Sequence, residues 1–265
     1  MITSIANPQI KYFRKLKNRK YRNETGMFLV EGTRIVIEAL EESKNITDLI
    51  VARELLRNEN AKKAVKDAES KGIPLVEVST EVFESLSTKD GPQGLAAIVR
   101  QNWHSLEEIS GTLGGVWIAL YEVSDPGNLG TIIRTLDGMG GEGVILIDQC
   151  TDPFDPSAIR ASMGAIFAKK IIKTDLISFE KWVRQKNVIV VGTSDSAERD
   201  YENFNYPRNL ILLMGSEREG LPDALAQICH SIVAIPMEGK SDSLNLSVAS
   251  SIILYEIYNQ HRKIS

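Results

Sequence analysis

Short apolar runs alternate with amphipathic segments along the whole chain, and this alternation predicts an α/β protein. Over residues 33–40 the apolar positions recur with the helical period, whereas runs such as 27–30 have the length of a buried strand. In the first hundred residues the pattern predicts helices over 10–22 and 60–71, a helix opening at 31–33, and strands at 27–30, 49–51, 75–78 and 96–99.

The second part of the chain alternates more regularly. Strands that alternate with helices imply a mainly parallel sheet covered on both faces, with ligands at the carboxyl ends of its strands. The segment 101–115 has three glycines and weak periodicity, so it predicts a linker between domains 1–100 and 116–265. The predicted strands are 116–121, 143–147, 188–191, 210–214 and 232–235, and the predicted helices are 129–139, 157–168, 179–185 and 246–258.

Composition excludes several classes of protein. Of the 265 residues, 43% are hydrophobic and 25% are charged, which is typical of a globular chain and not of a disordered or fibrous one. No apolar run approaches the ~18–20 residues of a membrane span, and Met1–Ser4 lacks a signal-peptide pattern. The two cysteines, Cys150 and Cys229, form neither a disulfide framework nor a metal-ligand spacing. We therefore expect a cytoplasmic protein with no membrane segment and no metal.

The net charge of −4 argues weakly against general nucleic-acid binding, but residues 11–22 contain seven cations and no acid. Tyr12, Phe13 and Tyr21 lie among these cations. Cations neutralise phosphates and aromatic rings stack on bases, so the run predicts an RNA-binding surface. A solvated amphipathic helix explains the same pattern equally well. The seven cations are Lys11, Arg14, Lys15, Lys17, Arg19, Lys20 and Arg22.

Two possible chemistries are disfavoured. The run Gly138–Gly143 matches the letters of a dinucleotide-binding loop, but it ends a predicted helix and enters a strand. A dinucleotide-binding loop follows a strand and opens a helix, so a helix end and turn is the better explanation and an oxidoreductase is disfavoured. His104, His230 and His261 lie far apart beside no repeating ligand pattern, which disfavours metal and Ser-His-Asp chemistry.

Three polar turns each follow a predicted strand. The first is Asp125–Gly130, which leads into a helix containing Arg134; the second is Gly215–Leu221; the third lies within 236–249. Each turn alone is explained as an ordinary connection between a strand and a helix. Together they are expected at one end of a parallel sheet.

In their order and separation the three turns resemble the three motifs of the SpoU (TrmH-type) RNA ribose methyltransferases. The stretches Asn7–Lys11 and Phe28–Gly32 resemble that family's N-terminal substrate-binding domain, and Asp155–Gly164 resembles a central stretch. The resemblance implies a homodimer whose catalytic half is an α/β sheet with a deep trefoil knot, an exception to the rule against threading. It also implies S-adenosylmethionine as the methyl donor.

The resemblance further implies where the methyl donor binds. The second and third turns supply the walls of the cofactor pocket, together with the end of the strand near 188–192. A glycine at 215 would let the main chain approach the ligand closely. The implied cofactor contacts are Thr193, Gly215, Ile235, Met237 and Leu244.

By position in the motifs, the resemblance implies Arg134 as the leading catalytic residue. Because the pKa of arginine stays above ~12, we expect Arg134 to hold an RNA phosphate and to stabilise the developing alkoxide. Direct deprotonation of the ribose hydroxyl by Arg134 is the alternative. The residues implied to shape its surroundings are Asn128, Glu217, Ser243 and Asn245.

The expected reaction is methyl transfer to a ribose 2′-hydroxyl of structured RNA. A full N-terminal domain without a long basic C-terminal extension favours ribosomal RNA over tRNA. Arg160 is expected either to contact a phosphate near the methyl acceptor or to form a structural ion pair. A tRNA methyltransferase is one alternative. A non-catalytic RNA-binding protein on the same fold is another, which the intact motif residues disfavour.

Overall fold

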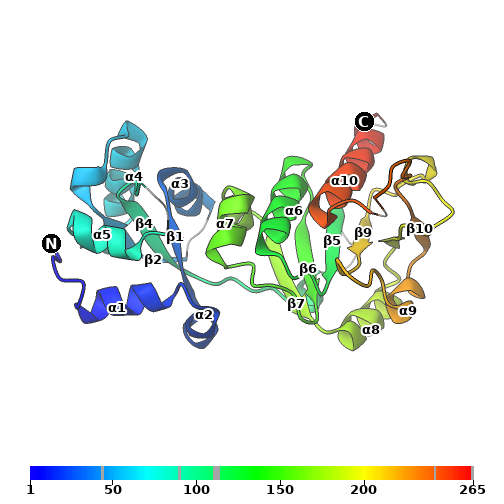
Figure 1. Ribbon diagram of the computed structural model, residues 1–265, viewed down its shortest axis with the longest axis horizontal. Helices are drawn as coiled ribbons and strands as arrows, with labels where there is room; N and C mark the ends of the chain where they lie inside the picture. Colours follow the sequence, from blue (N-terminus) through cyan, green and yellow to red (C-terminus); the bar gives the residue numbers. More distant parts are fainter. Residues whose placement is uncertain (43–44, 89–90, 110–113, 242, 264–265) are drawn as a thin grey trace. The chain divides into compact units, whose positions relative to one another are not determined.

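The computed structural model describes residues 1–42, 45–88, 91–109, 114–241 and 243–263 (Figure 1). Contacts between residues divide the chain into two compact units. The first is Met1–Asn102 together with Asp152–Ala168, and the second is Trp103–Thr151 together with Lys169–Ser265. The contacts therefore group a segment from the middle of the chain with the N-terminal part. Residues 110–113 of the predicted linker lie outside the described residues.

The first unit is built on a four-stranded sheet in the order β1-β4-β2-β3. Strand β4 is antiparallel to both β1 and β2, whereas β2 and β3 are parallel. Helices α1 and α5 contribute Phe13 and Phe83 to a buried apolar cluster that also contains Ile50 of the sheet. The elements are α1 (Pro8–Lys15), α2 (Arg19–Thr25), β1 (Met27–Glu31), α3 (Thr33–Glu42), β2 (Ile46–Val51), α4 (Glu59–Ser70), β3 (Leu75–Glu77), α5 (Thr80–Leu86), β4 (Leu95–Arg100) and α7 (Pro156–Ser162).

The predicted basic helix over 10–22 is two helices in the structure. Helix α1 ends at Lys15, and the Asn18 side chain accepts a hydrogen bond from the backbone N–H of Lys20, which starts α2. The guanidinium of Arg22 donates to the carbonyl oxygens of Leu16 and Lys17 at 3.0 and 2.7 Å. These carbonyls lie beyond the end of α1, so Arg22 satisfies acceptors that the helix leaves open.

The predicted helix over 157–168 is also interrupted. Helix α7 ends at Ser162, because Met163 and Gly164 take positive φ angles of 53° and 98° before a short 3₁₀ turn at Ala165–Phe167. A Cβ at Gly164 would lie 2.7 Å from the side chain of Glu38, so only glycine fits at this point of the first unit.

The second unit confirms the predicted α/β class with a parallel sheet. Its six strands lie in the order β10-β8-β9-β5-β6-β7, and each neighbouring pair is parallel. The elements are β5 (Val116–Tyr121), α6 (Pro126–Gly138), β6 (Gly143–Ile147), β7 (Lys170–Thr174), α8 (Leu176–Lys186), β8 (Val190–Thr193), β9 (Leu210–Met214), α9 (Asp223–Ala226), β10 (Ser231–Val233) and α10 (Leu246–Lys263).

Helices cover both faces of the parallel sheet. Alternate residues of β5 and β9, such as Trp117 and Ile211, join Phe179 and Trp182 of α8 in one buried cluster. Helices α6 and α10 pack against each other and against β6 and β9 (Figure 1). A sheet buried on both faces explains why its strands are continuous apolar runs. Helix α6 ends at Gly138 and Gly140 has a φ of 76°, so the interpretation of Gly138–Gly143 as a helix end and turn is confirmed.

The strand order places a switch point between β5 and β9. From β5 the chain continues to β6 and β7 on one side, whereas β9, β8 and β10 lie on the other. In open parallel sheets, ligands bind outside the carboxyl ends of the strands at such a point. The turns that follow β5 and β9 are the first two polar turns predicted from the sequence.

Candidate functional site

The three polar turns meet through a chain of hydrogen bonds at the carboxyl ends of β5 and β9. The Glu217 carboxylate accepts from the side-chain amide of Asn128 at 2.9 Å. The Asn128 carbonyl oxygen in turn accepts from the Asn245 amide at 3.1 Å. One residue of each turn therefore takes part, although 89 and 117 positions separate Asn128 from the other two along the chain.

The Glu217 carboxylate is also held by Ser124, which was not predicted as a site residue. Its backbone N–H and its hydroxyl donate to one carboxylate oxygen at 3.1 and 2.8 Å. Partial burial raises the pKa of Glu217, but the hydrogen bonds from Asn128 and Ser124 outweigh it and bring the pKa below its ordinary value. Glu217 is therefore ionised at neutral pH. The signal for Ser124 in the sequence is its place between β5 and the helix cap Asp125.

Asn245 connects this chain of hydrogen bonds to the start of α10. Its side-chain oxygen accepts from the backbone N–H and the hydroxyl of Ser247 at 2.9 and 2.7 Å. The oxygen of Asn245 is thus occupied by the helix, so its amide nitrogen must point to Asn128. The directions of both amide groups follow from the ionised Glu217 at one end and the helix N-terminus at the other.

All five predicted cofactor residues line one cavity of about 700 Å³ in the second unit. Three of the predicted catalytic residues, Glu217, Ser243 and Asn245, line the same cavity. Its lining combines apolar side chains, such as Val233, Ile235 and Ile253, with the charged side chains of Glu217, Arg218 and Glu219 in the second turn. This volume and mixture suit an adenosine-containing ligand. The five residues are Thr193, Gly215, Ile235, Met237 and Leu244.

Gly215 closes a turn of the cavity wall. The backbone groups of Ser216 and Gly220 exchange two hydrogen bonds of 3.0 and 3.1 Å. A Cβ at position 215 would lie 2.1 Å from the carbonyl carbon of Gly220. Position 215 therefore requires glycine because the backbone at Gly220 lies too close for a side chain. A close approach of a ligand would add to this requirement.

Arg134 lies apart from this hydrogen-bonded chain. Its side chain is exposed on α6, and among the described residues no hydrogen bond or ion pair joins it to the site. The next residue, Thr135, contacts Ser251 of α10 at 2.9 Å and thereby sets how α6 and α10 pack. The structure therefore brings together Asn128, Glu217, Ser243 and Asn245, but does not bring Arg134 to them.

The predicted RNA-binding cations of the first unit fall into three groups. Arg14 and Lys17 are half-buried and donate to the α5 region, Arg14 to the Ser85 hydroxyl and Lys17 to the Ser87 carbonyl, both at 2.9 Å. Burial lowers the pKa of Lys17, with Glu31 opposing the shift. Arg22 forms the second group. The exposed group is Lys11, Lys15, Arg19 and Lys20.

The prediction that Arg22 contacts RNA is wrong. Its side chain is 1% exposed and forms a 2.8 Å ion pair with Asp152, which is also buried. A second, longer contact of 3.3 Å reaches Asp155. A buried guanidinium needs a carboxylate partner and filled donors, and both are supplied within the first unit. Arg22 is therefore a structural residue that holds the segment Asp152–Ala168 to α2.

Among the described residues, no carboxylate forms an ion pair with Arg160, which was one of its two expected roles. Its guanidinium donates to the hydroxyls of Thr88 and Ser157 at 2.9 and 3.2 Å. Neutral partners leave its charge uncompensated by these contacts, and its side chain is partly exposed. A phosphate contact for Arg160 stays a prediction.

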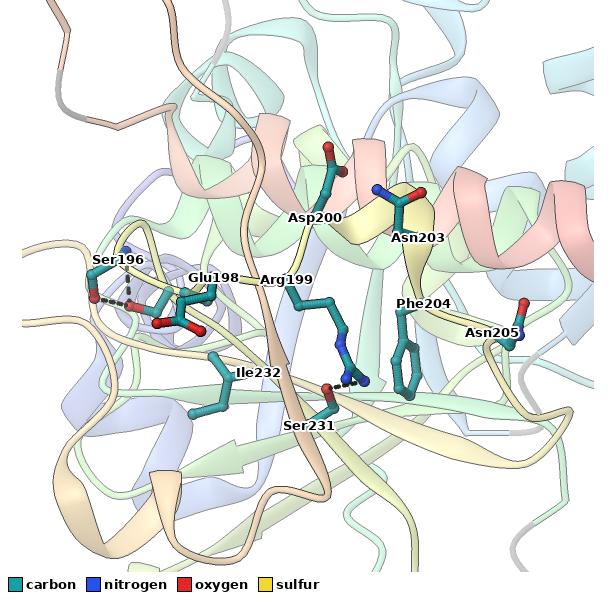
Figure 2. Close-up of a pocket in the computed structure, with 11 residues that line it drawn as sticks. Ser196, Glu198, Arg199, Asp200, Asn203, Phe204, Asn205, Ser231 and Ile232 are labelled. Atoms are coloured by element: carbon teal, nitrogen blue, oxygen red, sulfur yellow. Dashed lines mark hydrogen bonds between the residues drawn. The ribbon is translucent and has the colours of Figure 1, made fainter.

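A second, more open depression of about 1010 Å³ lies beside the cofactor cavity and shares Ser194 and Ser196 with it. Figure 2 shows Arg199 beside Phe204 and Ser231. The guanidinium lies 5.7 Å from the centre of the Phe204 ring and donates to the Ser231 hydroxyl at 3.2 Å. Because Arg199 is held there, it does not line the cofactor cavity.

Among the described residues, no group of three or more His, Cys, Asp or Glu side chains is placed to hold a metal ion. None of the described helices combines the length and the apolar character that a membrane span requires.

Two protein-family models match the chain. Residues 115–255 match the SpoU rRNA Methylase family, and residues 7–97 match an MRM3-like substrate binding domain. The chain is 30% identical over 256 residues to the 23S rRNA (guanosine(2553)-2′-O)-methyltransferase RlmP of Bacillus subtilis, covering 97% of this chain and 98% of the relative. It is 27% identical to the 23S rRNA (uridine(2479)-2′-O)-methyltransferase of Streptomyces viridochromogenes, covering 92% and 87% of the two chains.

A solved structure is similar over almost the same length. The crystal structure of an AdoMet-bound rRNA methyltransferase from Sinorhizobium meliloti matches with a TM-score of 0.89 and 36% identity, covering 98% of this chain and 97% of that one. Both units of the present chain are thus found together in that protein.

Proposed function

Because this chain belongs to the SpoU rRNA methylase family, we propose that it transfers a methyl group to a ribose 2′-hydroxyl of ribosomal RNA. Membership in the family confirms the resemblance seen in the three motifs, the enzyme class and S-adenosylmethionine as the methyl donor. The observation that carries the proposal is the meeting of the three motifs at one cavity, joined through Asn128, Glu217 and Asn245.

The residues around the cavity fit the methyl donor. When bound, S-adenosylmethionine supplies a methyl group on a sulfonium, which is a good leaving group. The chain's own task is therefore to align the ribose oxygen and to ease departure of its proton. Ile235, Met237 and Leu244 would hold the cofactor, together with the backbone at Thr193 and Gly215. The deep trefoil knot implied for this half of the chain is part of the proposal.

Glu217 is unsuited to accept the proton of the ribose hydroxyl. Both of its carboxylate oxygens accept hydrogen bonds from Ser124 and Asn128, and its pKa lies below the ordinary value. A carboxylate so stabilised is a weak base. We assign it the role of orienting Asn128, together with Asn245.

Arg134 is the proposed catalytic residue that stabilises negative charge in the reaction. Its planar guanidinium would bind a phosphate of the RNA and stabilise the developing alkoxide, while the proton leaves to phosphate or water. An exposed arginine without a protein partner among the described residues suits this role better than a structural one.

The first unit is proposed to bind the RNA substrate. Its match to a substrate binding domain and the exposed cations on α1 and α2 support this role. Arg14, Lys17 and Arg160 would add contacts near the half-buried surface that they share with Ser85 and Thr88. Arg22 is excluded from this surface by its burial.

We further propose that the enzyme is a cytoplasmic homodimer. Val248 and Tyr255 of α10 are large apolar side chains, yet they are 46% and 47% exposed. A partner subunit would cover these side chains, and it would bring a second set of side chains to the exposed Arg134. Light scattering on the purified chain should give twice the mass of one chain; a monomer at all concentrations would contradict this.

Transfer of labelled methyl from S-adenosylmethionine into ribosomal RNA and tRNA, assayed separately, tests the proposed reaction. We expect label in ribosomal RNA at the ribose. Arg134→Ala should lower the rate by about 100-fold or more. Arg134→Lys should remain within about tenfold of the alanine variant, because a point charge cannot replace the planar guanidinium.

Arg199→Ala is the matched control, since Arg199 is an exposed arginine of the same unit that contacts only the second depression. It should retain wild-type activity. Label in tRNA alone would show that the substrate is tRNA and not ribosomal RNA. Absence of label from both RNAs, together with absence of cofactor binding, would overturn the methyltransferase assignment. Wild-type activity in Arg134→Lys would remove the proposed role of the guanidinium.

A further inference from the structure

Asp195 lies two residues beyond the end of β8 and lines the cofactor cavity. Its side chain is exposed, and its carboxylate accepts a long hydrogen bond of 3.5 Å from the Ser194 hydroxyl. Among the described residues no cation lies within ion-pair distance of its carboxylate. None of the roles assigned above to the site uses this residue.

The cation closest to Asp195 in the sequence is held elsewhere. Arg199 belongs to the same loop, but its guanidinium lies against Phe204 and Ser231 in the second depression (Figure 2). It therefore does not neutralise the carboxylate of Asp195.

The cavity as a whole carries an excess of negative charge. Its lining includes three carboxylates, Asp195, Glu217 and Glu219, against the single guanidinium of Arg218. Glu217 is compensated by hydrogen bonds from Ser124 and Asn128, whereas Asp195 has no comparable partner. The short side chain of an aspartate at a strand end also has fewer rotamers than a glutamate, so its charge has a better defined position.

The reaction changes the charge of the cofactor. Methyl transfer breaks the bond between sulfur and the methyl carbon, forms a bond between that carbon and the ribose oxygen, and releases the hydroxyl proton. The sulfonium of S-adenosylmethionine thereby becomes the neutral thioether of S-adenosylhomocysteine. The two molecules are otherwise alike, so a carboxylate near the sulfur distinguishes them by charge alone.

From this arrangement we propose that Asp195 is a specificity-determining residue, which favours the sulfonium of the methyl donor over the thioether of the product and so promotes exchange of product for new donor. The inference rests on the proposed binding of S-adenosylmethionine in this cavity. Asp195 lines the same cavity as the five proposed cofactor residues, so its carboxylate lies at the wall of the space that the cofactor would fill. Unit charges about 6 Å apart, at a dielectric constant of about 40–80, change an affinity by about three- to tenfold.

Calorimetric titration of the full chain with S-adenosylmethionine, S-adenosylhomocysteine and sinefungin tests the inference. Sinefungin carries an amine cation in place of the sulfonium. Asp195→Asn should raise the Kd of both cationic ligands about three- to tenfold and change that of S-adenosylhomocysteine less than twofold. The effect should shrink at about 1 M salt, where charges are screened over ~3 Å.

Two further variants complete the experiment. Asp195→Glu keeps the charge and should keep most of the wild-type preference. Glu198→Gln removes an acid of the same loop that lines only the second depression, so it should leave all three Kd values unchanged.

Equal weakening of all three ligands in Asp195→Asn would show a contact with a part that they share, such as the ribose hydroxyls, and would overturn the inference. Unchanged Kd values would overturn it too. Failure of the wild-type chain to bind any of the three ligands would overturn the proposed use of the cavity itself, an outcome distinct from binding without discrimination.

Discussion

At the scale of single residues, the candidate site contains a carboxylate, Glu217, that is held in place by hydrogen bonds. Ser124 donates two hydrogen bonds to the Glu217 carboxylate, and Asn128 donates another. Asn128 is oriented in turn by Glu217 and Asn245. Loss of one donor from this chain of hydrogen bonds should let the next side-chain amide rotate more freely. The reason is that directional hydrogen bonds fix the orientation of the amide oxygen and nitrogen.

Ser124→Ala removes the hydroxyl donor at 2.8 Å and keeps the backbone donor. We expect methyl transfer to slow about two- to tenfold, the size of effect expected from one hydrogen bond, with little change in the KM for S-adenosylmethionine. Ser124→Thr keeps a hydroxyl and should restore most of the rate. Steady-state kinetics on both variants checks this positioning role; equal losses in the two variants would point to a general structural defect instead.

At the scale of elements, α7 is attached to α2 by a buried ion pair. Asp155 caps the start of α7, and the neighbouring Asp152 pairs with Arg22 of α2. The same guanidinium satisfies the carbonyls between α1 and α2. One side chain therefore holds three segments of the first unit, and its removal leaves both a buried carboxylate and open carbonyls.

Arg22→Met should lower the free energy of unfolding by about 3–5 kcal/mol, because it leaves the buried Asp152 carboxylate unpaired. Lys20→Met is the matched control on the same helix. Its ammonium is exposed and lies 3.9 Å from Glu24, so the change should cost less than about 1 kcal/mol. Urea unfolding of the full chain measures both. A similar small loss in the two variants would refute the anchoring role of Arg22.

At the scale of the whole molecule, charge is unevenly distributed. The chain carries a net charge of −4, yet Lys11, Lys15 and Lys20 are exposed on the helices that open the first unit. An RNA surface here would work by release of counterions from phosphates, and its affinity would therefore depend on salt. The cofactor cavity belongs to the second unit, so cofactor affinity should be independent of these lysines.

The triple variant Lys11→Gln, Lys15→Gln and Lys20→Gln should weaken RNA binding and flatten its dependence on salt concentration, without changing the Kd for S-adenosylmethionine. Filter binding at several salt concentrations measures the first, and calorimetry the second. The control replaces three exposed lysines of α4 in the same unit, Lys62, Lys63 and Lys66, with glutamine. An equal effect from the control would assign binding to net charge and not to α1 and α2.

The sequence by itself determined those helices and strands that depend mainly on local patterns of apolar and polar residues. The strands over 116–121, 143–147 and 210–214 were predicted with the bounds that the structure has, because uninterrupted apolar runs between polar turns have few other ways to be buried. The family resemblance carried by the motifs implied five cofactor residues, and all five line the cavity. The pattern missed β7 and α5, since Lys170–Thr174 has a lysine at each side of two isoleucines and resembles a polar loop.

Only the tertiary structure decided the fate of individual polar groups. Seven cations between residues 11 and 22 look alike in the sequence, yet Arg22 is buried because it pairs with Asp152. That partner lies 130 positions away, so local sequence could not predict the pairing. The contact between Ser124 and Glu217 was missed for the same reason, since 93 positions separate the two residues. Periodicity reports which face of an element is buried, whereas the pairing of charges and hydrogen bonds depends on which distant segments fold against it.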